Sequence, residues 1–177
     1  MEKFSIIYAD PPWDYDGRIQ HNGVDTTGSA TSHYPTMSLQ AIKSLKIPDI
    51  CEKDALCFMW TSSPHLVQAL EVMKAWGFEY KTIAFVWDKH RVNPGYYTMS
   101  QCEICLVGKR GKIPVRGSRN ERQLISEMRR RHSQKPDEVR RRIERMFPDV
   151  RKVELFARNV TPGWSVFGNQ VENSITI

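Results

Sequence analysis

The four residues Asp10-Pro11-Pro12-Trp13 form the part of this 177-residue sequence best suited to chemistry. They directly follow the apolar run over residues 4–9, which predicts a buried strand. Each proline lacks a backbone N–H and fixes φ at about −65°, so the turn is stiff and its carbonyls are bare. One carboxylate and one large aromatic ring therefore stand at the carboxyl end of a strand, where open α/β sheets bind ligands.

Such a turn could activate the exocyclic amino group of a nucleobase such as adenine. That nitrogen is a poor nucleophile because its lone pair is delocalised into the ring. Two acceptors on its two N–H bonds, the Asp10 carboxylate and the Pro11 carbonyl, would pull it toward sp³ geometry. Trp13 or a loop aromatic could stack on the base, and an electrophilic methyl group on a sulfonium would complete a transfer. The alternative is a purely structural turn.

The elements that must position this turn follow from hydrophobic periodicity. Strands are predicted over 3–9, 54–60, 79–87, 103–109, 153–157 and 164–168, and helices over 38–46, 63–76 and 136–147. Ser38 and Ser63 are expected to cap their helices, and Gly77 to end the second one. The strand–helix–strand order over 54–87 indicates a βαβ unit. We therefore expect an α/β fold, a mostly parallel central sheet flanked by helices, in a single domain over 1–177.

Three segments lack such periodicity. The polar stretch 14–35 follows the turn directly and is expected to be a lid. The stretch 88–100 contains Asn93-Pro94-Gly95, which is turn chemistry, and two aromatic residues, Tyr96 and Tyr97. The stretch 110–131 is basic. Sequence specificity for any target is expected in these three segments.

Composition excludes several other classes of function. Four cysteines in a chain of this length suggest no disulfide framework, and Cys102 and Cys105 should face opposite sides of a strand, which favours packing thiols over a shared metal. There is no G-x-G-x-x-G motif, P-loop or metal-spaced His/Cys cluster. No apolar run approaches membrane-spanning length, and the N-terminus is unlike a signal peptide, so a cytoplasmic location is expected.

The positive charge of the chain is concentrated in one region. The net charge is +6, yet residues 109–158 hold 17 Lys and Arg against 7 Asp and Glu, whereas the remainder holds 9 against 13. This asymmetry predicts a polyanionic partner such as nucleic acid. The alternative is a solvated basic helix face.

Several motifs in one order resemble the MT-A70 family of S-adenosylmethionine-dependent N6-adenine methyltransferases, which modify adenine in RNA or DNA. The resemblance covers nearly the whole chain. Its motifs lie at 7–13 (IYADPPW), 34–38 with 45–48, 56–60, 103–108, and in a C-terminal block at 132–136 (HSQKP), 154–158 (ELFAR), 162–164 and 168–170. It implies a Rossmann-like methyltransferase fold in permuted order, with the catalytic strand ahead of the cofactor-binding end.

The resemblance also implies roles for individual residues. The catalytic tetrad would be Asp10, Pro11, Pro12 and Trp13. Lys135 matches a contact to the methionine part of S-adenosyl-L-methionine, and it precedes a predicted helix N-terminus, where dipole and ammonium suit a carboxylate. The remaining cofactor contacts would be Arg158 and Asn159 at the ribose and Asn169 and Gln170 at the adenosine.

Candidate substrate contacts lie in the unpatterned segments and the basic region. The loops after the tetrad and after the third predicted strand match two gate loops around the target base, and Tyr34 falls at a gate position. The other candidates are Tyr97, Arg116, Arg119 and Arg130. No metal ligands are expected.

Three hypotheses about function remain at this stage. The chain resembles the minimal prokaryotic or phage members of the family, without zinc fingers, which favours DNA over RNA as substrate. Only nine residues precede Asp10, so an acidic cofactor contact that longer members provide upstream is expected to be missing or supplied elsewhere. The alternatives are the same methylation on RNA, or an inactive nucleic-acid-binding scaffold beside an active partner. A homodimer is possible in each case.

Overall fold

The strand that precedes the Asp10 turn lies inside a seven-stranded sheet. The computed structural model describes residues 2–14, 35–130 and 134–177. Its β1 (Phe4–Ala9) pairs in parallel with both β2 (Cys51–Thr61) and β6 (Lys152–Leu155). The full strand order is β5-β3-β4-β2-β1-β6-β7. The turn therefore leaves the sheet between two strands whose ends flank it.

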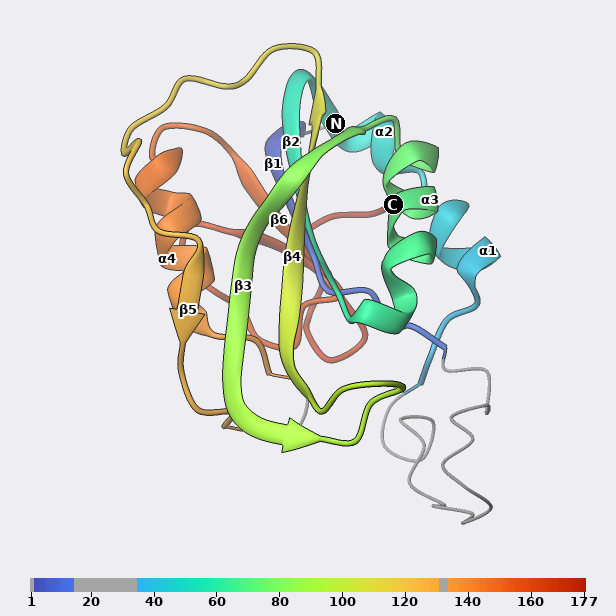
Figure 1. Ribbon diagram of the computed structural model, residues 1–177. Helices are drawn as coiled ribbons and strands as arrows, with labels where there is room; N and C mark the ends of the chain where they lie inside the picture. The colour runs from blue at the N-terminus through green and yellow to red at the C-terminus, as the bar shows by residue number, and fades with distance from the viewer. Residues whose placement is uncertain (1, 15–34, 131–133) are drawn as a thin grey trace.

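The other elements complete this sheet and cover it on both faces (Figure 1). Their bounds are α1 (Leu39–Lys43), α2 (Ile47–Ile50), the 3₁₀ turn η2 (Ser63–His65), α3 (Leu66–Ala75), β3 (Glu79–Asn93), β4 (Ser100–Arg110), β5 (Leu124–Ser126), α4 (Asp137–Met146) and β7 (Ser165–Phe167). Within the described residues, no helix has the length and apolar composition needed to cross a membrane.

The sheet is mixed, which corrects part of the prediction. Among the described strands, β4 alone runs against the others, and it pairs antiparallel with β2 on one side and β3 on the other. In the predicted βαβ unit, β2 and β3 do run in the same direction, because each is antiparallel to β4. However, the two strands are not neighbours, since β4 lies between them. Hydrophobic periodicity cannot reveal such an insertion, because it carries no information on pairing partners.

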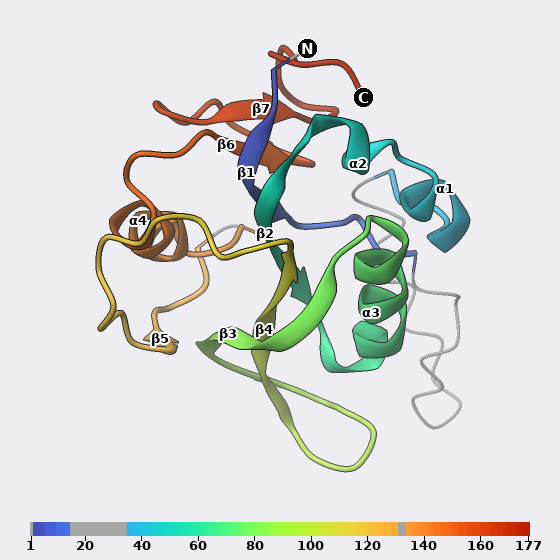
Figure 2. The same cartoon turned by 90° about the horizontal axis from the view of Figure 1, so that it is seen from above.

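Alternation along β1 divides the core between the two faces. Ile7 and Ala9 belong to one buried cluster, which includes residues of α1, α2 and α3. Ile6 and Tyr8 belong to the other, which includes Val139 and Ile143 of α4. Figure 2 shows α4 on the opposite side of the sheet from α1, α2 and α3. Successive strand residues point to opposite faces, so one short strand anchors both layers.

Most predicted elements are confirmed, with shifted ends. Ser38 caps α1, its Oγ accepting a hydrogen bond from the Ala41 N–H at 3.1 Å. Gly77, with φ of 81°, follows α3 as expected. The expectation that Ser63 caps the second helix is wrong, because Ser63 lies inside the 3₁₀ turn η2, for which Ser62 is the N-terminal flanking residue.

Two segments predicted as loops contain strand. β3 continues to Asn93, because its second half pairs with the start of β4 in a hairpin. The basic stretch 110–131 contains β5, which pairs in parallel with β3 and buries Ile125. In β4, Cys102 is exposed and Cys105 is buried, so the two thiols face different environments as expected.

Candidate active site

The turn after β1 is held by backbone hydrogen bonds, one within the turn and one from Met37. The Trp13 N–H donates a hydrogen bond to the Pro11 carbonyl at 2.9 Å, and the Met37 N–H donates to the Pro12 carbonyl at 3.0 Å. Trp13 and Met37 also form an isolated parallel bridge. The turn thus fixes the direction in which Asp10, the first residue after β1, leaves the strand. The Pro11 carbonyl keeps a second lone pair as an acceptor.

Trp13 anchors this turn in the core. The residue is only 8% exposed. Its ring lies nearly parallel to the His65 ring at 5.9 Å between centroids, and its indole N–H donates to the Trp60 carbonyl at 3.3 Å. A ring held in this way offers little surface to a base. Its placement therefore favours an anchoring role over the base-stacking role expected from the sequence.

Asp10 lies at one end of a chain of four alternating charges. Lys135 Nζ lies 3.1 Å from Asp10 Oδ2 and 3.3 Å from Glu103 Oε1, and Lys89 Nζ lies 3.9 Å from Glu103 Oε2. The Lys135 side chain is 11% exposed, whereas that of Asp10 is 29% exposed. The pairing occupies one carboxylate oxygen and holds it in place, and Oδ1 remains on the same partly exposed group as a second acceptor.

Burial and charge act in opposite directions on these groups. Burial raises the pKa of Asp10 above its ordinary value, Lys135 opposes the rise, and Glu103 adds to it. For Lys135, burial would lower the pKa, but the carboxylates of Asp10 and Glu103 raise it above its ordinary value. Lys135 therefore stays protonated at neutral pH, while Asp10 is a more basic carboxylate than usual.

The ring of Trp60 contacts Lys135 and is in turn hydrogen-bonded to Tyr8. Lys135 Nζ lies 5.7 Å from the centroid of the Trp60 ring, a cation–π contact, and the Trp60 indole N–H donates to the Tyr8 hydroxyl at 2.7 Å. Both rings are buried. Sequence reasoning assigned no role to Tyr8, Trp60 or Glu103. For Glu103, a charged residue at the start of an apolar strand was the available indication.

The predicted cofactor residues fall into two groups. Asp10, Lys135, Arg158 and Asn159 line one small pocket, which Tyr8, Gln134, Arg140, Glu154 and Phe156 complete. Phe156 has a φ of 59°, which is uncommon for a bulky residue and turns the chain sharply at the end of β6. An adjoining groove of about 500 Å³ lies between α4 and residues 159–162, and it shares Gln134, Arg140 and Asn159 with the pocket.

Asn169 and Gln170 lie at the neighbouring strand end. Ala157 N–H donates to the Phe167 carbonyl at 3.0 Å, and a Cβ at Gly168 would collide with the Ala157 backbone. The ends of β6 and β7 are therefore in direct contact. Asn169 and Gln170 are exposed and are not among the residues lining the pocket or the groove. The structure brings their chain segment to the site but not their side chains into these two cavities.

The predicted substrate residues are scattered. Tyr97 is fully exposed at the β3–β4 hairpin tip, and Tyr34 lies outside the described residues. Arg130 is close to the α4 N-terminus, 3.5 Å from Asp137 and 3.1 Å from Glu127. Arg116 and Arg119 flank residues 117 and 118, whose backbone N–H groups bond to the last turn of α4. Ten helical residues, about 15 Å, separate that end of α4 from its N-terminus beside Lys135.

Much of the positive charge around α4 is neutralised within the protein. Glu138 contacts three arginines, and Arg145 also forms a two-armed pair with Glu121 at 2.9 Å. Arg140 pairs with Glu154 at 2.7 Å and with Asp137. The basic region is thus partly a network of ion pairs rather than an open cationic face. Among the residues the structure describes, no cluster of His, Cys, Asp and Glu could hold a metal ion.

Known proteins share sequence similarity with almost the whole of this chain. The profile of the MT-A70 family matches residues 4–170. The chain is 45% identical to the type II methyltransferase M.MunI of Mycoplasma sp, over 99% of this chain and 82% of that protein. It is 32% identical to the N(6)-adenosine-methyltransferase MT-A70-like protein of Drosophila melanogaster and 30% identical to the N(6)-adenosine-methyltransferase catalytic subunit METTL3 of Homo sapiens. In both cases 97% of this chain aligns, with 28% and 29% of the longer protein, respectively.

Proposed function

The chain belongs to the MT-A70 family, and from this premise we propose that it transfers a methyl group from S-adenosyl-L-methionine to the N6 amino group of adenine in DNA. One observation carries the proposal. Asp10 stands at the strand tip with Oδ2 held by Lys135, so Oδ1 and the neighbouring Pro11 carbonyl can both face an amine. This is the acceptor pair that activation of an aromatic amino group requires.

In the proposed mechanism the turn acts by positioning and by hydrogen bonding. Asp10 Oδ1 and the Pro11 carbonyl each accept one N–H of the amino group, which draws its lone pair out of the ring. The transferred methyl group replaces one of these protons. The Asp10 carboxylate, which already accepts a hydrogen bond from the amino group, is the base that receives the released proton. Burial raises its pKa and makes it a better proton acceptor. Lys135 and Glu103 hold the carboxylate in place during these steps.

The pocket at Asp10, Lys135 and Arg158 has a volume of only about 50 Å³, so we propose that S-adenosyl-L-methionine extends from it into the adjoining groove. That groove, of about 500 Å³, lies within the range of about 300–1,000 Å³ usual for ligand sites. Lys135 uses two of its three N–H bonds on Asp10 and Glu103, so a third can reach the carboxylate of the methionine part. Arg158, Asn159, Asn169 and Gln170 would hold the ribose and adenosine. When bound, the cofactor supplies an electrophilic methyl group on a sulfonium.

DNA is favoured over RNA by the pattern of similarity. M.MunI, which aligns with this chain over 82% of its own length, is called a type II methyltransferase, and we propose the same class of activity here. The adenosine methyltransferases align over less than a third of their length. We further propose a Rossmann-like methyltransferase fold in permuted order, one methyltransferase domain over 1–177 and a cytoplasmic location.

The proposal is tested by expressing the chain in a host that lacks adenine methylation and mapping N6-methyladenine in its DNA and RNA. We expect methylated adenines in a defined DNA sequence. The matched control is Asp10→Asn, which keeps the size of the side chain and removes the charge. It should abolish methylation, while calorimetry still detects binding of S-adenosyl-L-methionine. Methylation confined to RNA would favour the second substrate, and full activity in Asp10→Asn would contradict the mechanism.

A further inference from the structure

The hairpin formed by the outer parts of β3 and β4 projects from the body of the protein (Figure 2). Its tip carries exposed apolar and aromatic side chains: Val92 is 50% exposed, Tyr96 69%, Met99 61% and Tyr97 101%. Residues 89–101 include Lys89, His90 and Arg91 and contain no acidic residue. Lys89 and His90 are paired with Glu103 and Asp88 at the hairpin base, whereas Arg91 is exposed. Exposed aromatic rings beside an exposed guanidinium suit a nucleic acid, in which phosphates and bases alternate.

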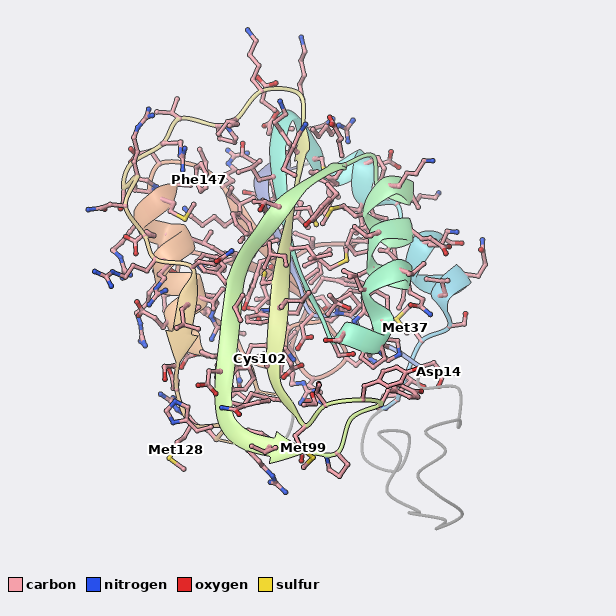
Figure 3. The ribbon with its side chains drawn as sticks, viewed as in Figure 1. Asp14, Met37, Met99, Cys102, Met128 and Phe147 are labelled. Atoms are coloured by element: carbon pink, nitrogen blue, oxygen red, sulfur yellow. The ribbon has the colours of Figure 1, made fainter. Side chains whose placement is uncertain are left out.

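The hairpin begins at the catalytic charges. Lys89 of β3 and Glu103 of β4 form an ion pair at 3.9 Å across the hairpin base, and Glu103 contacts Lys135, which contacts Asp10. The base of the hairpin is therefore connected to the catalytic carboxylate through three successive ion pairs. In Figure 3, Met99 on the hairpin and Asp14 after the catalytic turn lie along the same edge of the molecule. A duplex presented to Asp10 would pass this tip.

The tip is also shaped to hold its aromatic residues outward. A Cβ at Gly95 would collide with the Thr98 carbonyl, so the chain folds back tightly after Pro94. The cross-strand pair of Asn93 with Ser100 closes the hairpin immediately below. Tyr96 and Tyr97 thus stand on a short closed turn rather than on a long free loop. Ordering a rigid tip on DNA costs little conformational entropy.

We infer that this hairpin is a wedge that enters the base stack of duplex DNA beside the target adenine, with Tyr97 filling the space left by the extruded base. The inference rests on the proposed function, because a methyltransferase acting on duplex DNA must take the base out of the stack. The vacated space is flat and apolar, and an aromatic ring recovers stacking with the bases on either side. Arg91, which is exposed on the same hairpin, faces a flanking phosphate.

The wedge predicts a specific pattern in methylation kinetics. On matched duplex DNA, Tyr97→Ala should lower kcat/KM by roughly tenfold, the scale of one aromatic stacking contact. When the target adenine lies opposite an abasic site, extrusion needs no wedge, and the variant should match the wild type within about twofold. Tyr97→Phe should keep full activity on both duplexes. The control is Tyr80→Ala, a half-exposed tyrosine at the far end of β3, which should change neither rate.

A second measurement separates this inference from the proposed function. A photo-crosslinking amino acid, p-benzoylphenylalanine, replaces Tyr97, and the products with labelled duplex DNA are analysed after irradiation. Adducts with DNA are expected, and adducts only with a second copy of the chain would overturn the wedge in favour of a dimer contact. Equal losses of activity by Tyr97→Ala on both duplexes, or no loss on either, would also overturn it. Adducts with DNA from the crosslinking variant, together with a wild-type chain that methylates no nucleic acid, would overturn the proposed function alone.

Discussion

Asp10 combines two properties that seldom occur together in one carboxylate. It is paired with a cation, which normally lowers a carboxyl pKa, yet burial outweighs the pairing and raises it. Glu103, on the other side of Lys135, also raises the pKa of Asp10, as burial does. Asp10 is thus fixed in position without losing basicity, which suits a group that must both accept a hydrogen bond and receive a proton.

This balance predicts the acid limb of the pH–rate profile. The carboxylate is the working form of Asp10, so kcat should fall as the pH drops through a pKa above the ordinary value. Lys135→Met removes the charge that lowers this pKa and should move the limb to higher pH. Glu103→Gln removes a charge that raises it and should move the limb to lower pH. The measurement is kcat against pH at saturating cofactor and DNA, and shifts in the same direction for both variants would contradict the assignment.

At the scale of elements, α4 links the site to the rest of the molecule through charge. Its N-terminus lies beside Lys135, and its last turn receives the backbone of residues 117 and 118. Between these ends, Glu138 contacts Arg141, Arg142 and Arg145, and Arg145 reaches Glu121 in the irregular segment. The helix therefore ties the segment before β5 to the body by ion pairs as well as by its buried stripe of Val139 and Ile143.

Glu138 should contribute stability that depends on pH. Burial alone would raise its pKa, but hydrogen bonds from three arginines lower it to about 2, from an ordinary 4.5. A lowered carboxyl pKa stabilises the fold fully above pH 4.5, and the contribution is lost as the pH falls toward 2. Because the side chain is partly exposed, we expect Glu138→Gln to cost only about 1 kcal/mol at pH 7.

The measurement is urea denaturation of wild type and variant between pH 7 and pH 3, and the difference between them should shrink toward pH 3. Glu71→Gln serves as the control, because Glu71 forms a single exposed pair with Lys43 and should cost a few tenths of a kcal/mol at most. A constant difference across the whole pH range would show that Glu138 acts by packing and not by charge.

At the scale of the whole molecule, the distribution of charge sets how DNA can lie. Arg116 and Arg119 are at the end of α4 away from Asp10, and the α4 arginines are paired with carboxylates. Among the described residues outside the pocket, Arg130 pairs with Asp137 at the α4 N-terminus beside Lys135, and Arg91 is exposed on the β3–β4 hairpin. DNA bound at the active site should therefore meet the hairpin and Arg130 before it meets the longer basic segment.

Salt dependence of binding tests this orientation. Each phosphate contact contributes about 0.9 to the slope of log Kd against log salt concentration. Arg130→Ala should reduce the slope by about one, because its exposed pairs with Glu127 and Asp137 can be exchanged for a phosphate at small cost. Arg119→Ala should leave the slope unchanged. The readout is fluorescence anisotropy of labelled duplex DNA at several salt concentrations, and an equal effect of both variants would place DNA along the whole of α4.

The sequence by itself determined the local elements and the chemical character of the site. Apolar periodicity identified β1, and the two prolines identified the turn that displays Asp10, because burial pattern and backbone restriction act over a few neighbouring residues. Helix ends were also predictable where one residue determines them locally. Ser38 caps the start of α1, and Gly77 follows the end of α3. The resemblance to the MT-A70 family followed from short motifs that occur in the same order along the chain, and the family match over residues 4–170 confirms it.

Only the tertiary structure decided how distant charges and rings combine. It inserted β4 antiparallel between β2 and β3, and so brought Glu103 against Lys135 and Asp10. It buried Trp13, which favours an anchoring role for that ring, and it paired arginines that the sequence presents as a basic surface with carboxylates. These outcomes depend on strand pairing and on which side chains meet across the fold, and neither quantity is written in the local pattern of any one segment.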